Sequence, residues 1–235
     1  MTLARLTVPQ DWRNAEPFYR SAAERVRTAL ADPRTPERLT RYYNRGGDFA
    51  GASFLGLGEN DPARIGEADL LAATLLEAPV SALMARALLK DGPTRDRVHE
   101  LLSPERLPLD ARLEDVTPPV LAAMDELYTT LRAVVPPPTD RYQTGWTTAA
   151  KICARKRPDL FPVRDEVVCR YLGLWPSRYQ VDWQVFHTVM ADPRVRDELD
   201  RLVSRADESD TVDVGRQDAR LRHLDVVLWM HAPRR

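Results

Sequence analysis

Apolar residues along this chain recur mainly at spacings of three and four positions, which is the pattern of amphipathic α-helices. Runs of alternating β-branched residues, which are typical of strands, do not occur. The periodicity predicts helices over Ser21–Ala31, Pro36–Tyr43, Glu67–Leu89, Thr94–Leu102, Pro118–Val134, Thr147–Arg155, Asp165–Leu172, Asp182–Met190, Arg194–Ser204 and Gln217–His231. The sequence therefore predicts an all-α fold, a globular bundle of many helices.

The strongest helical pattern, Glu67–Leu89, contains a proline in its middle. Its apolar face is formed by Leu70, Leu71, Thr74, Leu75 and Ala78. Because Pro79 cannot donate a helical hydrogen bond, we expect two helices that meet near Glu77–Pro79. In the last helix the residues expected to face the core are Leu221, Leu224, Val227, Leu228 and Trp229.

Two segments are predicted to lack regular structure. The stretch Asn44–Asn60 carries five of the ten glycines and is interpreted as a long loop. Pro136–Pro137–Pro138 is expected to form a stiff spacer and gives the best internal boundary. The chain is therefore expected to form a single all-helical domain, 1–235, with the alternative of two lobes, 1–135 and 139–235.

Composition limits the class of protein. The 235 residues include 34 basic and 35 acidic side chains, 43% apolar residues and 29% charged residues, as in soluble globular proteins. The net charge of −1 argues against binding nucleic acid by bulk electrostatics. No apolar run approaches the ~20 residues of a membrane span, and the charged N-terminus is unlike a signal peptide. We therefore expect a cytoplasmic protein without a membrane partner.

Few residues are available for a metal or a cofactor. Cys153 and Cys169 are too few for a disulfide scaffold or a four-ligand zinc site, and the histidines have no partners at ligand spacing. No nucleotide-binding fingerprint is present. We expect neither a metal nor a cofactor.

Lysine occurs only at Lys90, Lys151 and Lys156, and all other basic residues are arginine. This bias indicates a GC-rich genome, such as that of an actinobacterium. A lysine that is kept against such a background is a candidate for chemistry, since a buried lysine loses its proton and arginine does not. The alternative is chance placement on a solvated helix face.

Asp165 and Lys151 are the candidate catalytic residues. Asp165 follows Pro162–Val163–Arg164 and opens a predicted helix, so it is either an N-cap or a carboxylate poised to take a proton from a substrate. Lys151 is placed to pair with Asp165 or to bind an anionic group of a substrate.

Other residues are candidates for substrate binding. Arg155, Lys156 and Arg157 form a basic cluster that either contacts phosphate or sulfate or stabilises the last turn of a helix. Trp146 either stacks on a substrate ring or belongs to the core. Tyr43 and Asp48 are candidates to line the same cleft. Asp225, inside the apolar last helix, needs a cation such as Arg170 or Arg222, and a structural ion pair is the favoured interpretation.

The stretch Thr144–Gly173, TGWTTAAKICARKRPDLFPVRDEVVCRYLG, resembles the helix-hairpin-helix DNA glycosylase superfamily. That resemblance implies a hairpin glycine at Gly145 and a catalytic aspartate at Asp165, 20 positions later. Asp69–Leu76 is similar to the helix that supplies the DNA-wedging loop of that superfamily. From about Tyr42 to Met230, including Ala154–Pro158 and Leu224–Met230, the chain also resembles an actinobacterial family of unknown function.

The sequence departs from the glycosylase pattern in several places. Gln143–Thr144–Gly145 stands where the hairpin has two glycines, and Thr147 stands where bifunctional enzymes carry a Schiff-base lysine. Glu77–Ala78–Pro79 replaces the wedging glutamine, and there is no cysteine cluster for an iron–sulfur centre. The resemblance thus implies a scaffold and one candidate acid.

Three function classes remain. The favoured one is a cofactor-independent enzyme that acts on a small molecule with an anionic group, in actinobacterial natural-product biosynthesis. Its concrete form is a carboxylate-assisted intramolecular substitution or elimination that closes a small nitrogen ring such as an aziridine. The second class is a monofunctional DNA glycosylase or a protein that binds DNA lesions. The third is a non-catalytic subunit of a heteromer, and homo-oligomers also stay open.

Overall fold

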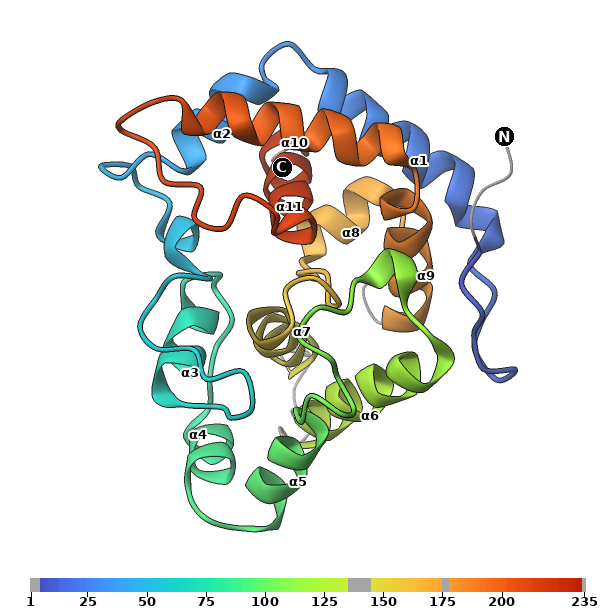
Figure 1. Ribbon diagram of the computed structural model, residues 1–235, viewed down its shortest axis with the longest axis vertical. Coiled ribbons are helices and arrows are strands. Elements are labelled where there is room, and N and C mark those ends of the chain that lie inside the picture. Colours follow the sequence, from blue (N-terminus) through green and yellow to red (C-terminus); the bar gives the residue numbers. More distant parts are fainter. Residues whose placement is uncertain (1–4, 135–144, 175–177, 234–235) are drawn as a thin grey trace. The chain divides into compact units, whose positions relative to one another are not determined.

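The computed structural model describes residues 5–134, 145–174 and 178–233 (Figure 1). These residues form eleven α-helices and two short 3-10 helices, with no β-strand. The all-α prediction is thus confirmed. The α-helices are α1 (Glu16–Ala31), α2 (Thr35–Tyr42), α3 (Glu67–Thr74), α4 (Ala82–Leu89), α5 (Pro93–Leu101), α6 (Pro118–Val134), α7 (Gly145–Lys156), α8 (Glu166–Leu172), α9 (Tyr179–Met190), α10 (Pro193–Asp207) and α11 (Arg220–His231), and the 3-10 helices are η1 (Ala50–Ser53) and η2 (Leu113–Asp115).

The described residues divide into two compact units. Unit 1 consists of residues 5–52, 113–115 and 162–233, and unit 2 consists of residues 53–112, 116–134 and 145–161. Each unit contains segments from both sides of the proline-rich segment. The division into units is therefore not the division into the lobes 1–135 and 139–235. Pro136–Pro138 lie outside the described residues.

In unit 1, α2 packs against α10 and α11, and α1 packs against α8, α9, α10 and α11. The core of this unit is apolar and includes Val26 of α1, Leu39 of α2, Leu199 of α10 and Leu224 of α11, all essentially inaccessible to solvent. The inward face predicted for the last helix is confirmed for four residues, while Trp229 is only half-buried. In Figure 1 the helix α11 ends near the C-terminus, among helices of the same unit.

In unit 2, α7 packs against α3 and α6, and α5 packs against α4 and α6. Met84, Leu88, Leu101 and Leu127 are buried in its core. The break predicted in Glu67–Leu89 is confirmed, because α3 ends at Thr74 and α4 begins at Ala82. Between them Glu77 has a φ of 58°, a left-handed conformation that a helix does not continue through.

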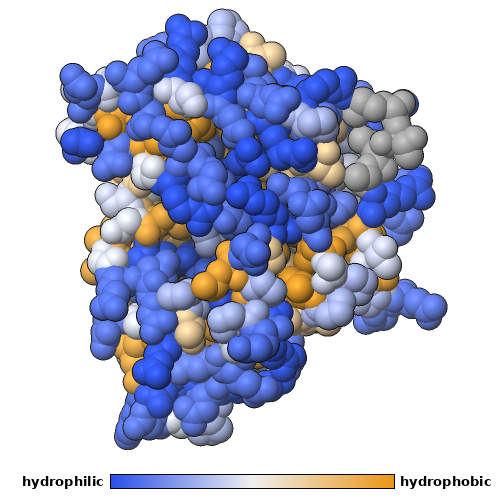
Figure 2. All heavy atoms as spheres, viewed as in Figure 1, coloured by the Kyte–Doolittle hydropathy of each residue, from blue (hydrophilic) through white to orange (hydrophobic). Residues whose placement is uncertain are grey.

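The apolar face predicted for this segment is only partly correct. Leu70 is buried, but Leu71 is 56% exposed and Thr74 is exposed. The helix α3 packs against α4 and α7, and the side of α3 that carries Leu71 and Thr74 is exposed to solvent. Exposed apolar side chains are common on protein surfaces. Figure 2 shows one face of the molecule, where hydrophilic residues dominate and hydrophobic residues form separate patches.

Helix ends follow local sequence signals. Ser81 accepts a hydrogen bond from Met84 N at 3.1 Å and caps α4, and Pro93 and Pro193 occupy the first turns of α5 and α10. The helix α8 ends at Gly173, which has a φ of 76°. This left-handed conformation favours glycine, and a Cβ there would make the flexible Arg25 side chain move.

Candidate functional site

Asp165 is the N-cap of α8, in unit 1. Its backbone is extended, and its carboxylate accepts a hydrogen bond from Val167 N at 2.8 Å. The residue is half-buried. The capping role expected from the sequence is therefore present, and it points the carboxylate at the positive end of the helix dipole. A catalytic role for Asp165 stays a prediction.

The residue before Asp165 anchors this turn. Arg164 is fully buried and donates to Asp182 Oδ2 of α9, with Nε at 2.7 Å and Nη2 at 2.6 Å. Cys169 of α8 lies 3.7 Å from the same oxygen through its sulfur. Burial raises the pKa of Asp182 to about 6, and the Arg164 guanidinium opposes that shift. A buried ion pair thus fixes the backbone from which Asp165 projects.

A second buried network joins α2 and α11 in the same unit. Arg222 donates through Nη1 to Asp225 Oδ2 and through Nη2 to the Tyr42 hydroxyl and to the Gly51 carbonyl, the last at 2.9 Å. All three of the side chains are buried. The favoured interpretation of Asp225 as half of an ion pair is confirmed, with Arg222 as its partner.

The phenol of Tyr42 in this network responds to several charges. Burial raises the pKa of Tyr42, and the charges of Asp225 and Asp165 raise it further, whereas Arg222 lowers it. The phenol proton of Tyr42 is therefore firmly held at neutral pH.

Tyr43, predicted to line a cleft, is buried beside this network. Its hydroxyl lies 2.9 Å from His223 Nδ1, and His223 Nε2 lies 3.0 Å from the Arg216 carbonyl. A carbonyl only accepts, so Nε2 carries the proton and Nδ1 accepts from Tyr43. Burial lowers the pKa of His223 to about 4 and raises the pKa of Tyr43. The pair is therefore neutral at pH 7.

The loop after α2 holds Asp48 at the surface. Asn44 forms an isolated antiparallel bridge with Val212, and Arg45 N donates to the Thr211 carbonyl at 2.8 Å. Phe49 stacks on Tyr42 with ring centroids 5.1 Å apart. Asp48 itself is exposed, and no described residue forms a hydrogen bond or ion pair with its side chain. Its predicted place in the site stays a prediction.

The remaining candidates lie in unit 2, on α7 and at Arg157 directly after it. Lys151 is buried, and its Nζ donates to the Leu76 carbonyl. Trp146 is buried as well, and its carbonyl accepts from the Tyr128 hydroxyl at 3.5 Å. Gly145 begins α7, as the hairpin resemblance implies, while Gln143 and Thr144 lie outside the described residues.

The basic cluster Arg155–Lys156–Arg157 is buried as a whole. Arg155 donates to the carbonyls of Phe54 and Leu57 and, at 3.3 Å, to Asp69 Oδ1. Lys156 binds Asp69 Oδ2, the Asn60 side chain at 2.9 Å and the Asp61 carbonyl at 2.8 Å. Arg157 donates to four carbonyls, those of Pro62, Leu102, Leu107 and Lys156.

These contacts show what the three cations do within unit 2. They tie the end of α7 to the glycine-rich loop and to the segment after α5. Burial lowers the pKa of Arg157 to about 10, so it stays charged at neutral pH. The donors point at main-chain oxygens inside the protein, and contact of this cluster with a substrate stays a prediction.

The predicted site residues thus fall into two groups. Asp165, Tyr43 and Asp48 belong to unit 1, and Lys151, Trp146 and the basic cluster belong to unit 2. The sequence interpretation missed the pairs Arg164–Asp182 and Tyr43–His223. Nothing in the sequence marks either pair, because their members are far apart along the chain or lie on different helices.

Within the described residues, no three side chains of His, Cys, Asp or Glu come together in a way that would hold a metal ion. No described helix is both long and apolar enough to cross a membrane.

Residues 36–232 match a protein family that is described as a family of unknown function (DUF6308). No curated protein and no solved structure matches the chain.

Proposed function

The chain belongs to the DUF6308 family of unknown function, and we propose that it is an enzyme that uses Asp165 as a general base on a small molecule. The proposal includes a scaffold like that of helix-hairpin-helix glycosylases and catalysis without a cofactor. It also places the protein in the natural-product biosynthesis of an actinobacterium, which is the origin that the arginine bias favours.

The observation that carries the proposal is the way in which Asp165 is held. Asp165 is half-buried at the start of α8 and directly follows Arg164, which forms a buried ion pair with Asp182. A buried ion pair costs desolvation free energy, and this pair holds the residue next to Asp165 in place. Rigid support of a reactive carboxylate is a use that accounts for this pair.

The reaction that we propose is closure of a small nitrogen ring. Asp165 takes a proton from a substrate ammonium, and the nitrogen lone pair then attacks a neighbouring carbon within the same molecule. The bond from that carbon to a sulfate or phosphate ester oxygen breaks, and the anion leaves with the electron pair. The enzyme mainly aligns the amine opposite its leaving group, a contribution that reaches several kcal/mol in well-oriented reactions.

The DNA alternative has one observation in its favour. The helix α7 begins at Gly145 and α8 begins after Asp165, as the glycosylase pattern implies. However, the basic residues closest in sequence to this pattern, Lys151, Arg155, Lys156 and Arg157, are all buried. Buried cations with protein partners are poorly placed to neutralise phosphates. The small-molecule enzyme is therefore the better-supported function.

The test compares two capping aspartates. Asp165→Asn removes the charge at α8, and Asp192→Asn does the same at α10, where Asp192 caps the helix by accepting from Arg194 N at 3.1 Å. The probe is 2-aminoethyl hydrogen sulfate, the simplest amine with a neighbouring sulfate ester. Sulfate release and aziridine formation are followed by ion chromatography and NMR.

We expect turnover by the wild-type protein, a loss of about 100-fold or more in Asp165→Asn, and no more than a twofold change in Asp192→Asn. Equal turnover by wild type and Asp165→Asn would contradict the catalytic assignment. A band-shift assay with abasic duplex DNA tests the alternative. Nanomolar retention that weakens steeply with salt would replace our proposal by the DNA-binding one.

A further inference from the structure

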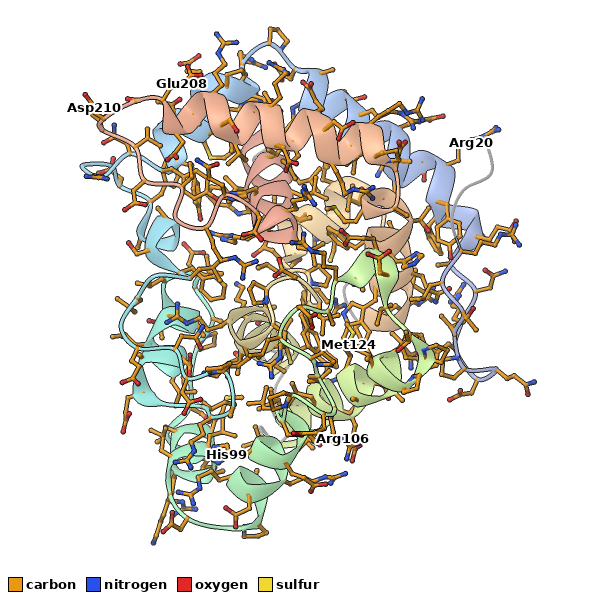
Figure 3. All side chains as sticks on the ribbon, in the orientation of Figure 1. Arg20, His99, Arg106, Met124, Glu208 and Asp210 are labelled. Atoms are coloured by element: carbon orange, nitrogen blue, oxygen red, sulfur yellow. The ribbon has the colours of Figure 1, made fainter. Side chains whose placement is uncertain are left out.

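Unit 2 contains a cavity that is separate from every residue considered above as a site. Its volume is about 250 Å³, room for several water molecules at ~30 Å³ each. Residues from the segment before α3 and its first turn, from the end of α4 and from α5 surround it. The lining residues are Arg64, Ile65, Gly66, Glu67, Leu89, Arg95 and His99. Figure 3 labels His99, which lies on α5.

Two lining residues carry a buried nitrogen with no hydrogen-bond partner among the described residues. These atoms are Arg95 Nε and His99 Nε2. An arginine Nε–H only donates, so what this wall of the cavity lacks is an acceptor. A buried donor without a partner costs about 1–3 kcal/mol, and such groups in native proteins call for an explanation.

The charge around the cavity also favours an acceptor with negative charge. Burial lowers the pKa of His99, and the guanidinium groups of Arg95 and Arg64 lower it further. Arg64 is exposed, and within the described part of the chain its side chain has no hydrogen-bond or ion-pair partner. Gly66 and Glu67 supply the start of α3, where the helix dipole is positive.

Acidic groups act in the opposite direction and limit the size of the charge. Asp91 and Asp96 pair with Arg95, and Asp96 and Asp61 raise the pKa of His99. Glu67 lines the cavity and is exposed. The Gly66 amide is already used, since it donates to Asp69 Oδ2 at 2.8 Å. The remaining unpaired positive charge on the wall is that of Arg64.

We propose that this cavity binds the oxyanion group of a small ligand, a phosphate or a carboxylate, through Arg64, Arg95 and His99. Arg64 supplies the uncompensated charge, and a small shift of the two α5 side chains brings their nitrogens to the anion. The apolar side of the cavity, Ile65 and Leu89, faces the remainder of the ligand. This site is independent of the function proposed for Asp165, since it uses none of the same residues.

The experiment is an NMR titration of the whole protein with inorganic phosphate and, separately, with acetate, at constant ionic strength in sodium chloride. The signals followed are the imidazole nitrogens of His99 and the amides of Gly66 and Glu67. His231 is the internal control, because it is also a half-buried histidine, with Asp32 and Arg38 as partners. We expect saturable shifts at His99 and none at His231, and a higher pKa of His99 when the anion is bound.

Two variants and a control make the result specific. Arg64→Gln is expected to weaken binding about tenfold, the effect of losing one charge-assisted hydrogen bond, and Glu67→Gln to strengthen it about threefold. Arg86→Gln removes another exposed arginine of unit 2 outside this cavity and is expected to leave affinity unchanged. Tighter binding of phosphate identifies a phosphorylated ligand, and tighter binding of acetate a carboxylate.

The proposal is overturned by any of three results. The shifts at His99 rise linearly without saturation, or His99 and His231 shift equally, or Arg64→Gln binds phosphate as tightly as the wild-type protein does. All variants are first checked for unchanged amide spectra elsewhere in the chain, so that a loss of binding reflects the cavity.

Discussion

Both units bury cations, but they bind them in different ways. In unit 2, Arg155, Lys156 and Arg157 donate mainly to main-chain carbonyls, with Asp69 as their carboxylate. In unit 1, Arg222 binds the side chains of Asp225 and Tyr42 and a single carbonyl. A carbonyl neither titrates nor changes with the residue type, whereas a carboxylate and a phenol do both. The first arrangement is suited to holding a loop, and the second to tuning a site.

The largest effect that we expect is a loss of stability when Arg155 of unit 2 is replaced. Arg155→Met leaves two buried carbonyls without their donor and removes one of the two cations that bind Asp69, so we expect the free energy of unfolding to fall by about 3–5 kcal/mol. Urea denaturation measures the change. Arg20→Met, at an exposed position of α1 (Figure 3), is the control and is expected to change stability by less than about 0.5 kcal/mol.

In unit 1, we expect a second substitution at Asp225 to restore part of the stability that is lost when Arg222 is replaced. Arg222→Met leaves Asp225 buried without its cation and costs about 3 kcal/mol. In the double variant Arg222→Met/Asp225→Asn, we expect at least half of that loss to be recovered, since the buried charge is gone. In Arg155→Met/Asp69→Asn we expect little recovery, because the carbonyl contacts stay lost. Equal recovery in the two units, measured as a double-mutant cycle, would erase the distinction.

In unit 1, the buried histidine His223 makes stability depend on pH. Burial lowers the pKa of His223 from 6.5 to about 4, so the unfolded chain binds a proton at a higher pH than the folded one does. His223 therefore contributes a loss of about 2 kcal/mol of stability when the pH falls from 8 to 5. Asp182 acts in the opposite direction over this range, because its pKa is raised to about 6 and folding favours its protonated form.

His223→Gln isolates the histidine. The stability difference between wild type and this variant is measured by urea denaturation at pH 8 and at pH 5, and it is expected to shrink by about 2 kcal/mol at the lower pH. Because Asp182 is present in both proteins, its effect cancels. A difference that does not depend on pH would mean that His223 is not buried as a neutral group.

The smallest effect concerns one hydroxyl. Tyr43→Phe removes the donor to His223 Nδ1, and we expect a loss of about 1 kcal/mol, the net value of a buried hydrogen bond. Tyr171→Phe is the matched control, since its hydroxyl donates to the Arg25 carbonyl at 2.9 Å but the residue is half-buried. Thermal unfolding ranks the two variants, and a larger loss in Tyr171→Phe would contradict the expected order.

Local interactions explain which features the sequence predicts. Helix periodicity, the break at Pro79 and the N-cap at Asp165 depend on residues within one or two turns, and so does the Arg222–Asp225 pair, three residues apart. The contact between Tyr43 and His223 joins positions 180 apart, and no local pattern encodes it. The burial of Arg155–Lys156–Arg157 also escapes prediction, because their acceptors are backbone oxygens that leave no trace in the residue types.

That choice of acceptors determines how relatives of this chain are free to differ. Every amino acid presents the same main-chain oxygen. Substitutions at positions 53–62 therefore preserve most of the acceptors in this segment that bind Arg155, Lys156 and Arg157, and the side chain of Asn60 is the exception. An insertion or a deletion in this segment is expected to be harmful, because it shifts the main-chain oxygens away from the three cationic side chains that bind them. The glycine-rich stretch is thus expected to tolerate amino-acid substitutions better than insertions or deletions.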